Sequence, residues 1–260
     1  MRRVIFNQKG GVGKSTITCN LAAISAIDDK KTLVIDLDIQ GNSTHYLLGR
    51  KVTNADQTLA HFYKESLGVS LFGKTSSGDL RDVIHETPFP NLYVVPSHPE
   101  MESLQSRLES RYKIYKLKEA LDTLHDFDRI YIDTPPVLNF FSRSALIAAK
   151  QCVIPFDCDA FSREALLTLL DAITEIKADH NADLNVEGIV VNLFQGRANL
   201  PNQLVNELIE QGLPVLNTKL SVSVKVRESH SDSKPLIHYA PDHKLTEEFI
   251  ALHEELHNRQ

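Results

Sequence analysis

The residues best suited to bind a charged ligand lie in a glycine- and lysine-rich segment near the N-terminus. Glycines let a backbone curl so that its N–H groups point at phosphate oxygens, and a following helix N-terminus adds a favourable dipole. Lys14 is placed to reach the β- and γ-phosphates of a nucleotide, and the Ser15 hydroxyl is placed to ligate Mg²⁺. The segment therefore predicts a phosphate-binding loop, and it reads Gln8-Lys9-Gly10-Gly11-Val12-Gly13-Lys14-Ser15-Thr16.

The elements around this loop fit the same prediction. An apolar run at Arg3–Asn7 predicts a strand before it, and a helical pattern at Lys14–Ile27 follows it directly, as phosphate-binding loops require. Strict Walker A spacing would place glycine at position 8, where this chain has Gln8. The chain instead has a second lysine, Lys9, at the front of the loop.

Short apolar runs alternate with longer amphipathic ones along the rest of the chain. The apolar runs lack polar alternation, which is typical of strands covered on both faces. We expect an α/β fold with a doubly wound, mostly parallel sheet, in a single domain over residues 1–260. Further strands are predicted at Thr32–Asp36, Leu92–Pro96, Arg129–Asp133, Gln151–Phe156 and Val186–Leu193. Further helices are predicted at Met101–His125, Arg143–Ala149, Arg163–Ala178, Pro201–Gln211 and Lys244–His257.

Two stretches lack such a pattern. Gly68–Gly78 is rich in glycine and serine, which favours a surface loop. Ser221–Pro241 shows little periodicity before the last helix.

The composition excludes several classes of protein. Of the 260 residues, 42% are hydrophobic and 24% are charged, as in ordinary globular proteins. No run approaches the roughly 18 apolar residues of a membrane span. Three cysteines without a CxxC spacing favour a reducing, cytoplasmic setting over a disulfide framework. The net charge of −6 argues against nucleic-acid binding by bulk charge and leaves a local basic patch open.

Three motifs together resemble the ParA/MinD group of P-loop ATPases. Lys9–Thr16 resembles the deviant Walker A motif of that group. The stretch Asp36-Leu37-Asp38-Ile39-Gln40-Gly41-Asn42-Ser43-Thr44 resembles its switch I, and Arg129-Ile130-Tyr131-Ile132-Asp133-Thr134-Pro135-Pro136 resembles its Walker B and switch II. The motifs occur in the order of the group and at about its separations.

The resemblance implies ATP and Mg²⁺ as cofactors and gives several residues roles. Asp133 would hold Mg²⁺ together with Ser15, with Asp36 near the metal, and Asp38 would orient or activate the attacking water. Lys9 would cross a homodimer interface to the phosphates of the partner subunit, so that dimerisation depends on ATP. Asn192, at the end of the strand predicted at Val186–Leu193, would read the adenine edge.

The resemblance also implies partners. In ParA-like proteins basic residues near the C-terminal region contact DNA without sequence preference, and here that surface would comprise Lys225, Arg227 and Lys234. The basic stretch Arg107–Lys118 is a second candidate surface. A ParB-like adaptor would stimulate hydrolysis in a cytoplasmic, nucleoid-associated ATPase that partitions plasmids or chromosomes. The last helix is acidic, which argues against membrane binding.

Two other functions stay open at this stage. The same switch could position a protein cargo, such as a chemotaxis, flagellar or envelope assembly. A metabolic P-loop synthetase, in which Lys9 serves the substrate, is a further alternative. The sequence His253-Glu254-Glu255-Leu256-His257 matches a zinc motif, but it ends too near the C-terminus for a third ligand to follow, so packing of the helix is the preferred interpretation.

Overall fold

The strands form one eight-stranded sheet in the order β3-β4-β2-β5-β1-β6-β7-β8. The computed structural model describes residues 1–68, 78–159 and 162–259, so most of the predicted loop at Gly68–Gly78 lies outside the described residues. The pairing is parallel apart from the short antiparallel contact between β3 and β4. The strands are β1 (Arg2–Ile5), β2 (Thr32–Asp36), β3 (His85–Glu86), β4 (Leu92–Val95), β5 (Arg129–Asp133), β6 (Gln151–Asp157), β7 (Asn185–Phe194) and β8 (Val215–Ser221).

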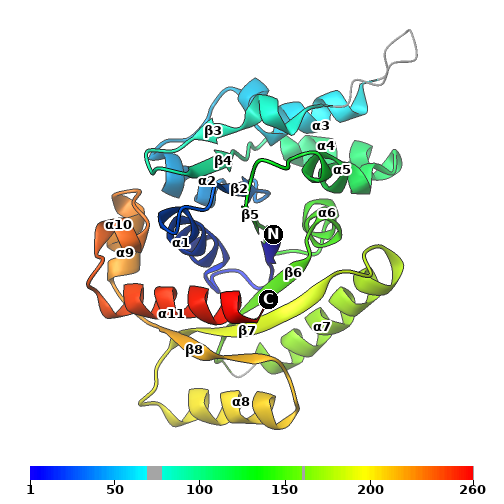
Figure 1. The fold of residues 1–260 in the computed structure, drawn as a ribbon. Helices are drawn as coiled ribbons and strands as arrows, with labels where there is room; N and C mark the ends of the chain where they lie inside the picture. Colours follow the sequence, from blue (N-terminus) through cyan, green and yellow to red (C-terminus); the bar gives the residue numbers. More distant parts are fainter. Residues whose placement is uncertain (69–77, 160–161, 260) are drawn as a thin grey trace.

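Helices cover both faces of the sheet, which confirms the predicted doubly wound α/β fold (Figure 1). They are α1 (Lys14–Ile27), α2 (Asn42–Leu48), α3 (Leu59–Leu67), α4 (Met101–Ser110), α5 (Lys116–Asp122), α6 (Phe140–Ala148), α7 (Ser162–Asp179), α8 (Asn199–Glu210), α9 (Lys225–Ser231), α10 (Leu236–Tyr239) and α11 (Lys244–Asn258).

Successive strand residues supply two separate cores, because side chains alternate across a sheet. In β1, Val4 packs in the core that also contains Phe141 of α6. The next residue, Ile5, packs in the opposite core with Ile17 of α1 and Phe249 of α11. Because Val4 and Ile5 are both fully buried, this part of β1 is apolar on both faces of the sheet, as the lack of polar alternation predicted.

The register of the central strands brings acidic residues to one edge of the sheet. Asp36 at the end of β2 pairs with Asp133 at the end of β5, and Ile5 of β1 pairs with the same Asp133. Asp157 at the end of β6 pairs with Asn192 of β7. The carboxyl ends of β1, β2, β5, β6 and β7 therefore meet where ligands bind in open α/β sheets.

One predicted helix is wrong. Met101–His125 is not continuous: α4 ends at Ser110 and α5 begins at Lys116. Between them Tyr112 adopts a left-handed conformation with φ of 54°. This turn lets α5 bury Leu117 and Leu121, and no glycine or proline in the sequence marks it.

The stretch Ser221–Pro241 also contains more regular structure than its pattern indicated, since it forms α9 and α10. Edge strand β8 and helices α2 and α3 were not predicted. Across the described ranges, no helix combines the length and apolarity needed to cross a membrane.

Candidate active site

The predicted phosphate loop joins β1 to α1 and requires glycine at two positions. Gly11 and Gly13 have φ of 78° and 89°, a conformation that residues with a Cβ rarely adopt. A Cβ on Gly13 would also lie 2.3 Å from the side-chain nitrogen of Asn192. Because Gly13 is the N-cap of α1, the first backbone N–H groups of the helix face the space in front of the loop.

Lys14 lies at the inner end of this loop. Its side chain is mostly covered, with the residue 7% exposed, and its ammonium donates to the carbonyl of Lys9 at 3.0 Å. Burial lowers the pKa of Lys14, and the negative charges of Asp133 and Asp38 oppose that shift. The loop therefore holds a cation that has lost much of its water, which suits it to bind phosphate oxygens.

A cavity of about 350 Å³ opens in front of the loop. Residues from the loop, from the segment after β2 and from the segment after β5 line it together. The lining side chains beyond the glycines are Lys14, Ser15, Thr16, Asp38, Gln40, Asn42, Pro136 and His230.

Asp133 has the surroundings expected of a cation ligand. It is fully buried at the end of β5, and Ser43 Oγ donates to its Oδ2 at 2.7 Å. Burial raises the pKa of Asp133, while hydrogen bonds from Ser15 and Ser43 lower it. A buried carboxylate beside a serine hydroxyl suits Mg²⁺, a hard cation that takes oxygen ligands from protein, phosphate and water. Within the described residues, no three His, Cys, Asp or Glu side chains are grouped so that they could hold a metal ion. At this site Mg²⁺ would take its remaining oxygen ligands from phosphate and water.

Asp36 is also fully buried, but its oxygens are occupied by the neighbouring loop. Its Oδ2 accepts from both the backbone N–H and the hydroxyl of Thr44, each at 2.7 Å, and its Oδ1 accepts from the N–H of Asp38 at 3.2 Å. Burial and the adjacent Asp133 raise the pKa of Asp36. In this structure Asp36 fixes the start of α2, so its place near a metal stays a prediction.

Asp38 lies beside the cavity that the phosphates would fill. It is 7% exposed, and its Oδ1 accepts from the N–H of Gln40 at 3.0 Å. This bond holds the carboxylate at the cavity wall, where a general base or a water-orienting group must lie.

Lys9 points away from the cavity of its own chain. Its ammonium is 2.6 Å from Oδ2 of Asp157, the last residue of β6, and also pairs with Asp159 two residues further on. It is not among the residues that line the cavity. Its predicted contact with a partner subunit would therefore require these ion pairs to be exchanged.

Asn192 contacts the loop directly. It is 8% exposed, and its side-chain nitrogen donates to the carbonyl of Val12 at 2.9 Å. The contact stabilises the loop from β7, and the adenine contact of Asn192 stays a prediction.

Three contacts at the site were not assigned from the sequence. Ser43 and Thr44 lie within the switch-like stretch and hold Asp133 and Asp36. His230 reaches the cavity from α9, and its Nε2 is 3.0 Å from Thr16 Oγ1. The serine and threonine that follow Asp36 and Asp38 in the sequence could have suggested the contacts of Ser43 and Thr44. No sequence signal pointed to His230, because it lies in a stretch without periodicity.

The predicted DNA-binding residues lie close together in sequence around α9. Arg227 and Lys234 are exposed, whereas the Lys225 ammonium is 2.7 Å from Glu228 and lies over the Tyr239 ring. The competing stretch Arg107–Lys118 is divided between α4, a 3₁₀ turn and α5. Two lysines of this stretch, Lys116 and Lys118, form ion pairs with acidic residues of α5.

The HExxH-like sequence on α11 makes structural contacts. His253 Nε2 is 3.0 Å from Ser25 Oγ, and burial lowers the pKa of His253 to about 4. Glu255 accepts from the backbone N–H groups of Asn217 and Thr218, both at 2.8 Å. These bonds dock α11 on α1 and β8.

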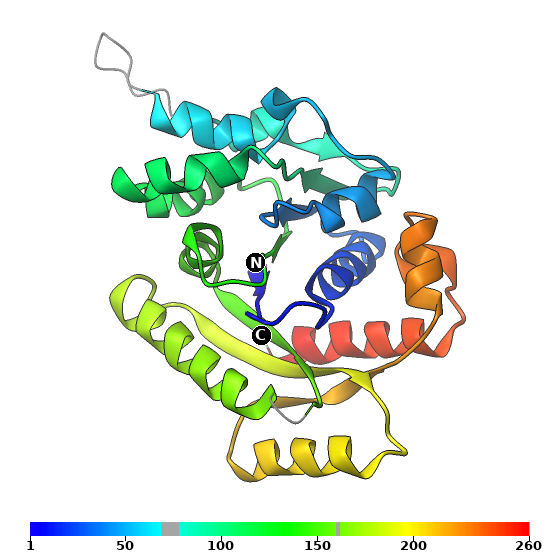
Figure 2. The same ribbon diagram turned by 180° about the vertical axis from the view of Figure 1, so that it is seen from behind.

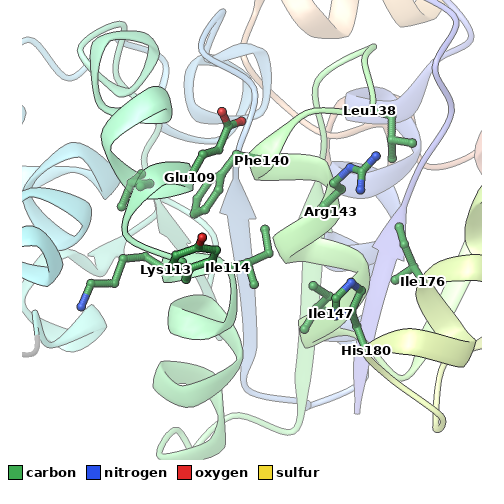
Figure 3. Close-up of a pocket in the computed structure, with 11 residues that line it drawn as sticks. Glu109, Lys113, Ile114, Leu138, Phe140, Arg143, Ile147, Ile176 and His180 are labelled. Atoms are coloured by element: carbon green, nitrogen blue, oxygen red, sulfur yellow. The ribbon is translucent and has the colours of Figure 1, made fainter.

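A second cavity, of about 480 Å³, lies among α4, α6 and α7 (Figure 3). Its wall is apolar at Ile114, Phe140 and Ile147, and Arg143 and His180 stand at its margin. None of the residues predicted to bind nucleotide or Mg²⁺ lines it. The chemistry of the loop therefore belongs to the smaller cavity.

Comparison with known proteins identifies the family of this chain. Residues 3–186 match the AAA domain family. The chromosome partitioning protein ParA of Myxococcus xanthus is 34% identical over 260 residues, which cover 98% of this chain and 87% of that protein. The sporulation initiation inhibitor protein Soj of Bacillus subtilis is 31% identical over 255 residues, which cover 97% and 96%.

A solved structure shows the same fold. The septum site-determining protein MinD of Pyrococcus horikoshii, complexed with Mg-ADP, has a TM-score of 0.76 and 24% identity, with 98% of this chain and 95% of that one covered. Since the relatives match nearly the whole length, the chain belongs to the ParA/Soj family of P-loop ATPases and is an enzyme that hydrolyses ATP.

Proposed function

We propose that this ATPase forms an ATP-bound dimer that binds DNA without sequence preference and partitions a plasmid or chromosome. Lys14, Ser15 and Asp38 line one cavity, and the negative charge of the buried Asp133 acts on the Lys14 ammonium. This arrangement is the observation that carries the ATPase part. The similarity to the M. xanthus chromosome partitioning protein supports the partition part. We further propose that residues 1–260 act as one domain, which the single sheet supports.

The residues of the cavity divide the work of hydrolysis. The N–H groups of the loop and the Lys14 ammonium bind the phosphates, and Asp38 holds the attacking water. Ser15 and Asp133 would hold Mg²⁺, which neutralises charge on the transferred phosphoryl group. Asp133 keeps its orientation through Ser43, so the carboxylate needs no rearrangement to receive the metal.

Lys9 supports the dimer part of the proposal. Its ammonium lies at the end of β6, outside its own cavity, and the side chain is 35% exposed. A cation at this edge can transfer from Asp157 to the phosphates of a second subunit, which would make the dimer dependent on ATP. A Lys9→Gln variant should bind ATP as the wild type does and stay monomeric with ATP in sedimentation velocity. An ATP-dependent dimer of that variant would remove Lys9 from the interface.

DNA binding is tested most directly by fluorescence anisotropy with a random-sequence duplex. We expect the protein with a non-hydrolysable ATP analogue to bind, with a log–log salt slope of about −0.9 for each phosphate contact. Arg227→Ala should reduce the magnitude of that slope by about one, and Arg107→Ala, on the competing surface, is the matched control. Salt-sensitive binding that depends on Arg107 instead would move the interface to α4. No binding in the ATP form would favour a protein cargo, with a ParB-like or other adaptor as its partner.

A further inference from the structure

Helix α9 contacts the phosphate loop through one side chain. His230 Nε2 is 3.0 Å from the hydroxyl of Thr16, in the first turn of α1. His230 also lines the cavity that contains Lys14 and Asp38. Figure 2 shows α9 and α10 beside α1, opposite α6 across the sheet. A residue 214 positions beyond Thr16 therefore closes part of the nucleotide cavity.

The same helix contacts α2, which follows the switch-like stretch. The rings of His230 and Tyr46 stack with centroids 4.0 Å apart and planes 8° from parallel. Tyr46 Oη also lies 2.9 Å from Ser229 Oγ, and both residues are buried. Since buried polar contacts with full hydrogen bonding favour one arrangement, α9 is fixed against α1 and α2 together.

Helix α9 also bears two of the predicted DNA-binding residues, Lys225 and Arg227. Its seven residues extend about 10 Å at 1.5 Å per residue, so it moves as one short rigid element. Arg227 lies one turn before His230 and is exposed. A shift of His230 relative to Thr16 must therefore move Arg227.

We propose that His230 is a positioning residue that ties the phosphate loop to α9, so that the nucleotide in the cavity sets the placement of Arg227 and Lys225. The part of this inference that concerns DNA affinity rests on the proposed function. His230 takes part in no catalytic step, because its ring acts through Thr16.

Hydrogen bonding gives a physical reason for the coupling. Burial, with a smaller contribution from His45, lowers the pKa of His230. A neutral imidazole has one donor and one acceptor nitrogen. The Thr16 hydroxyl has a single proton: it donates that proton either to His230 Nε2 or to a phosphate oxygen in the cavity. When a phosphate oxygen accepts the hydrogen bond from Thr16, His230 can keep its own bond to Thr16 only as the tautomer that donates from Nε2. The nucleotide and the imidazole ring therefore compete for the hydrogen bond that the Thr16 hydroxyl donates.

Two substitutions separate the contacts of His230. His230→Phe keeps an aromatic ring against Tyr46 and loses the bond to Thr16, whereas His230→Gln keeps a hydrogen-bonding group and loses the stack. The matched control is His238→Phe on α10, because the His238 ring stacks on Phe89 and not on Tyr46. All are measured at saturating ATP analogue or ADP, so that changes in nucleotide affinity do not enter.

The first readout is the ratio of DNA affinities with ATP analogue and with ADP. Couplings between sites are about 5- to 150-fold, and we expect His230→Phe to reduce the wild-type ratio by at least about fivefold. His230→Gln should recover part of it, and His238→Phe should retain it. A ratio unchanged in His230→Phe would overturn the assignment, as would an equal loss in His238→Phe.

The second readout does not use DNA and separates the two proposals. Hydrogen exchange of the amides at 225–231 should slow when ATP analogue binds the wild type, and this change should be absent in His230→Phe. If the wild type binds no DNA but shows this change, the proposed function fails and the role of His230 stands. If the exchange change persists in His230→Phe, the role of His230 is refuted whatever the DNA result.

Discussion

Replacing Glu187 by Gln would leave a buried arginine without its counter-charge. Arg3 of β1 is 1% exposed, and its Nε and Nη2 each donate to a carboxylate oxygen of Glu187 at 2.6 Å. Glu187 is 6% exposed on β7, and the third guanidinium nitrogen of Arg3 donates to Tyr131 Oη at 3.1 Å. This pair joins the strand before the phosphate loop to the strand that bears Asn192.

The expected magnitude follows from the burial of both partners. Removing one member of a buried ion pair costs about 3–5 kcal/mol, because the other charge stays desolvated. Total stabilities are about 5–15 kcal/mol, so Glu187→Gln should remove a large fraction of the free energy of unfolding. At about 2–4 °C per kcal/mol for a chain near this size, Tm should fall by roughly 6–20 °C.

Urea unfolding of the nucleotide-free protein, followed by circular dichroism, measures this change. The control is the double variant Arg3→Met with Glu187→Leu, which removes both charges and keeps apolar volume. Such replacements are often neutral or stabilising, so the double variant should unfold within about 1 kcal/mol of the wild type. A Glu187→Gln protein within 1 kcal/mol of the wild type would refute the reasoning. A double variant as unstable as the single would show that packing, not charge, sets the effect.

Further predictions concern the loop, the catalytic acid and α11. Lys14→Ala should weaken ATP binding by roughly 10- to 100-fold in calorimetry, because it removes a charge-assisted contact. Gly13→Ala should also impair ATP binding, since its Cβ would lie 2.3 Å from Asn192 Nδ2 at a φ of 89°. Asp38→Ala should bind ATP normally and hydrolyse it about 10²- to 10⁴-fold more slowly in a phosphate-release assay. The pKa of His253 is about 4 in the fold, below its ordinary 6.5. The unfolded chain therefore gains a proton first as pH falls. His253 should lower stability between about pH 6.5 and 4, by up to about 3 kcal/mol relative to His253→Gln in urea titrations.

Each of these predictions has an outcome that would contradict it. Unchanged ATP affinity in the Lys14 or Gly13 variants would mean that the loop does not bind phosphate. Wild-type turnover in the Asp38 variant would remove that residue from the mechanism. Parallel pH profiles for the wild type and the His253 variant would show that His253 takes up its proton equally in both states.

Much of the sheet and the phosphate loop was predictable, because both depend on local patterns. The strands Thr32–Asp36 and Arg129–Asp133 and the helix Lys14–Ile27 occur with the predicted bounds. In parallel strands buried on both faces, an apolar run and its terminal aspartate are enough to mark a strand and its end.

Other elements were not predictable for equally physical reasons. The turn at Tyr112 uses a left-handed residue that is neither glycine nor asparagine, and it allows Leu117 and Leu121 to be buried in the core where α5 packs against α6. Strand β8 lies at the sheet edge with part of each face exposed, so its residues show no continuous apolar run.

Local sequence was enough to predict that glycines, Lys14 and Ser15 would lie around a phosphate, since those residues are adjacent along the chain. The distant residues that complete the site became known only from the folded chain. Asn192 meets Val12 and His230 meets Thr16 across 180 and 214 positions. Strand register and helix docking set such contacts, and their free energy depends on burial that no local pattern encodes. The same reason explains why the ion pair of Lys9 was not predicted. The charge of Lys9 is evident from the sequence, but its pairing with Asp157 depends on β1 and β6 being neighbours in the sheet.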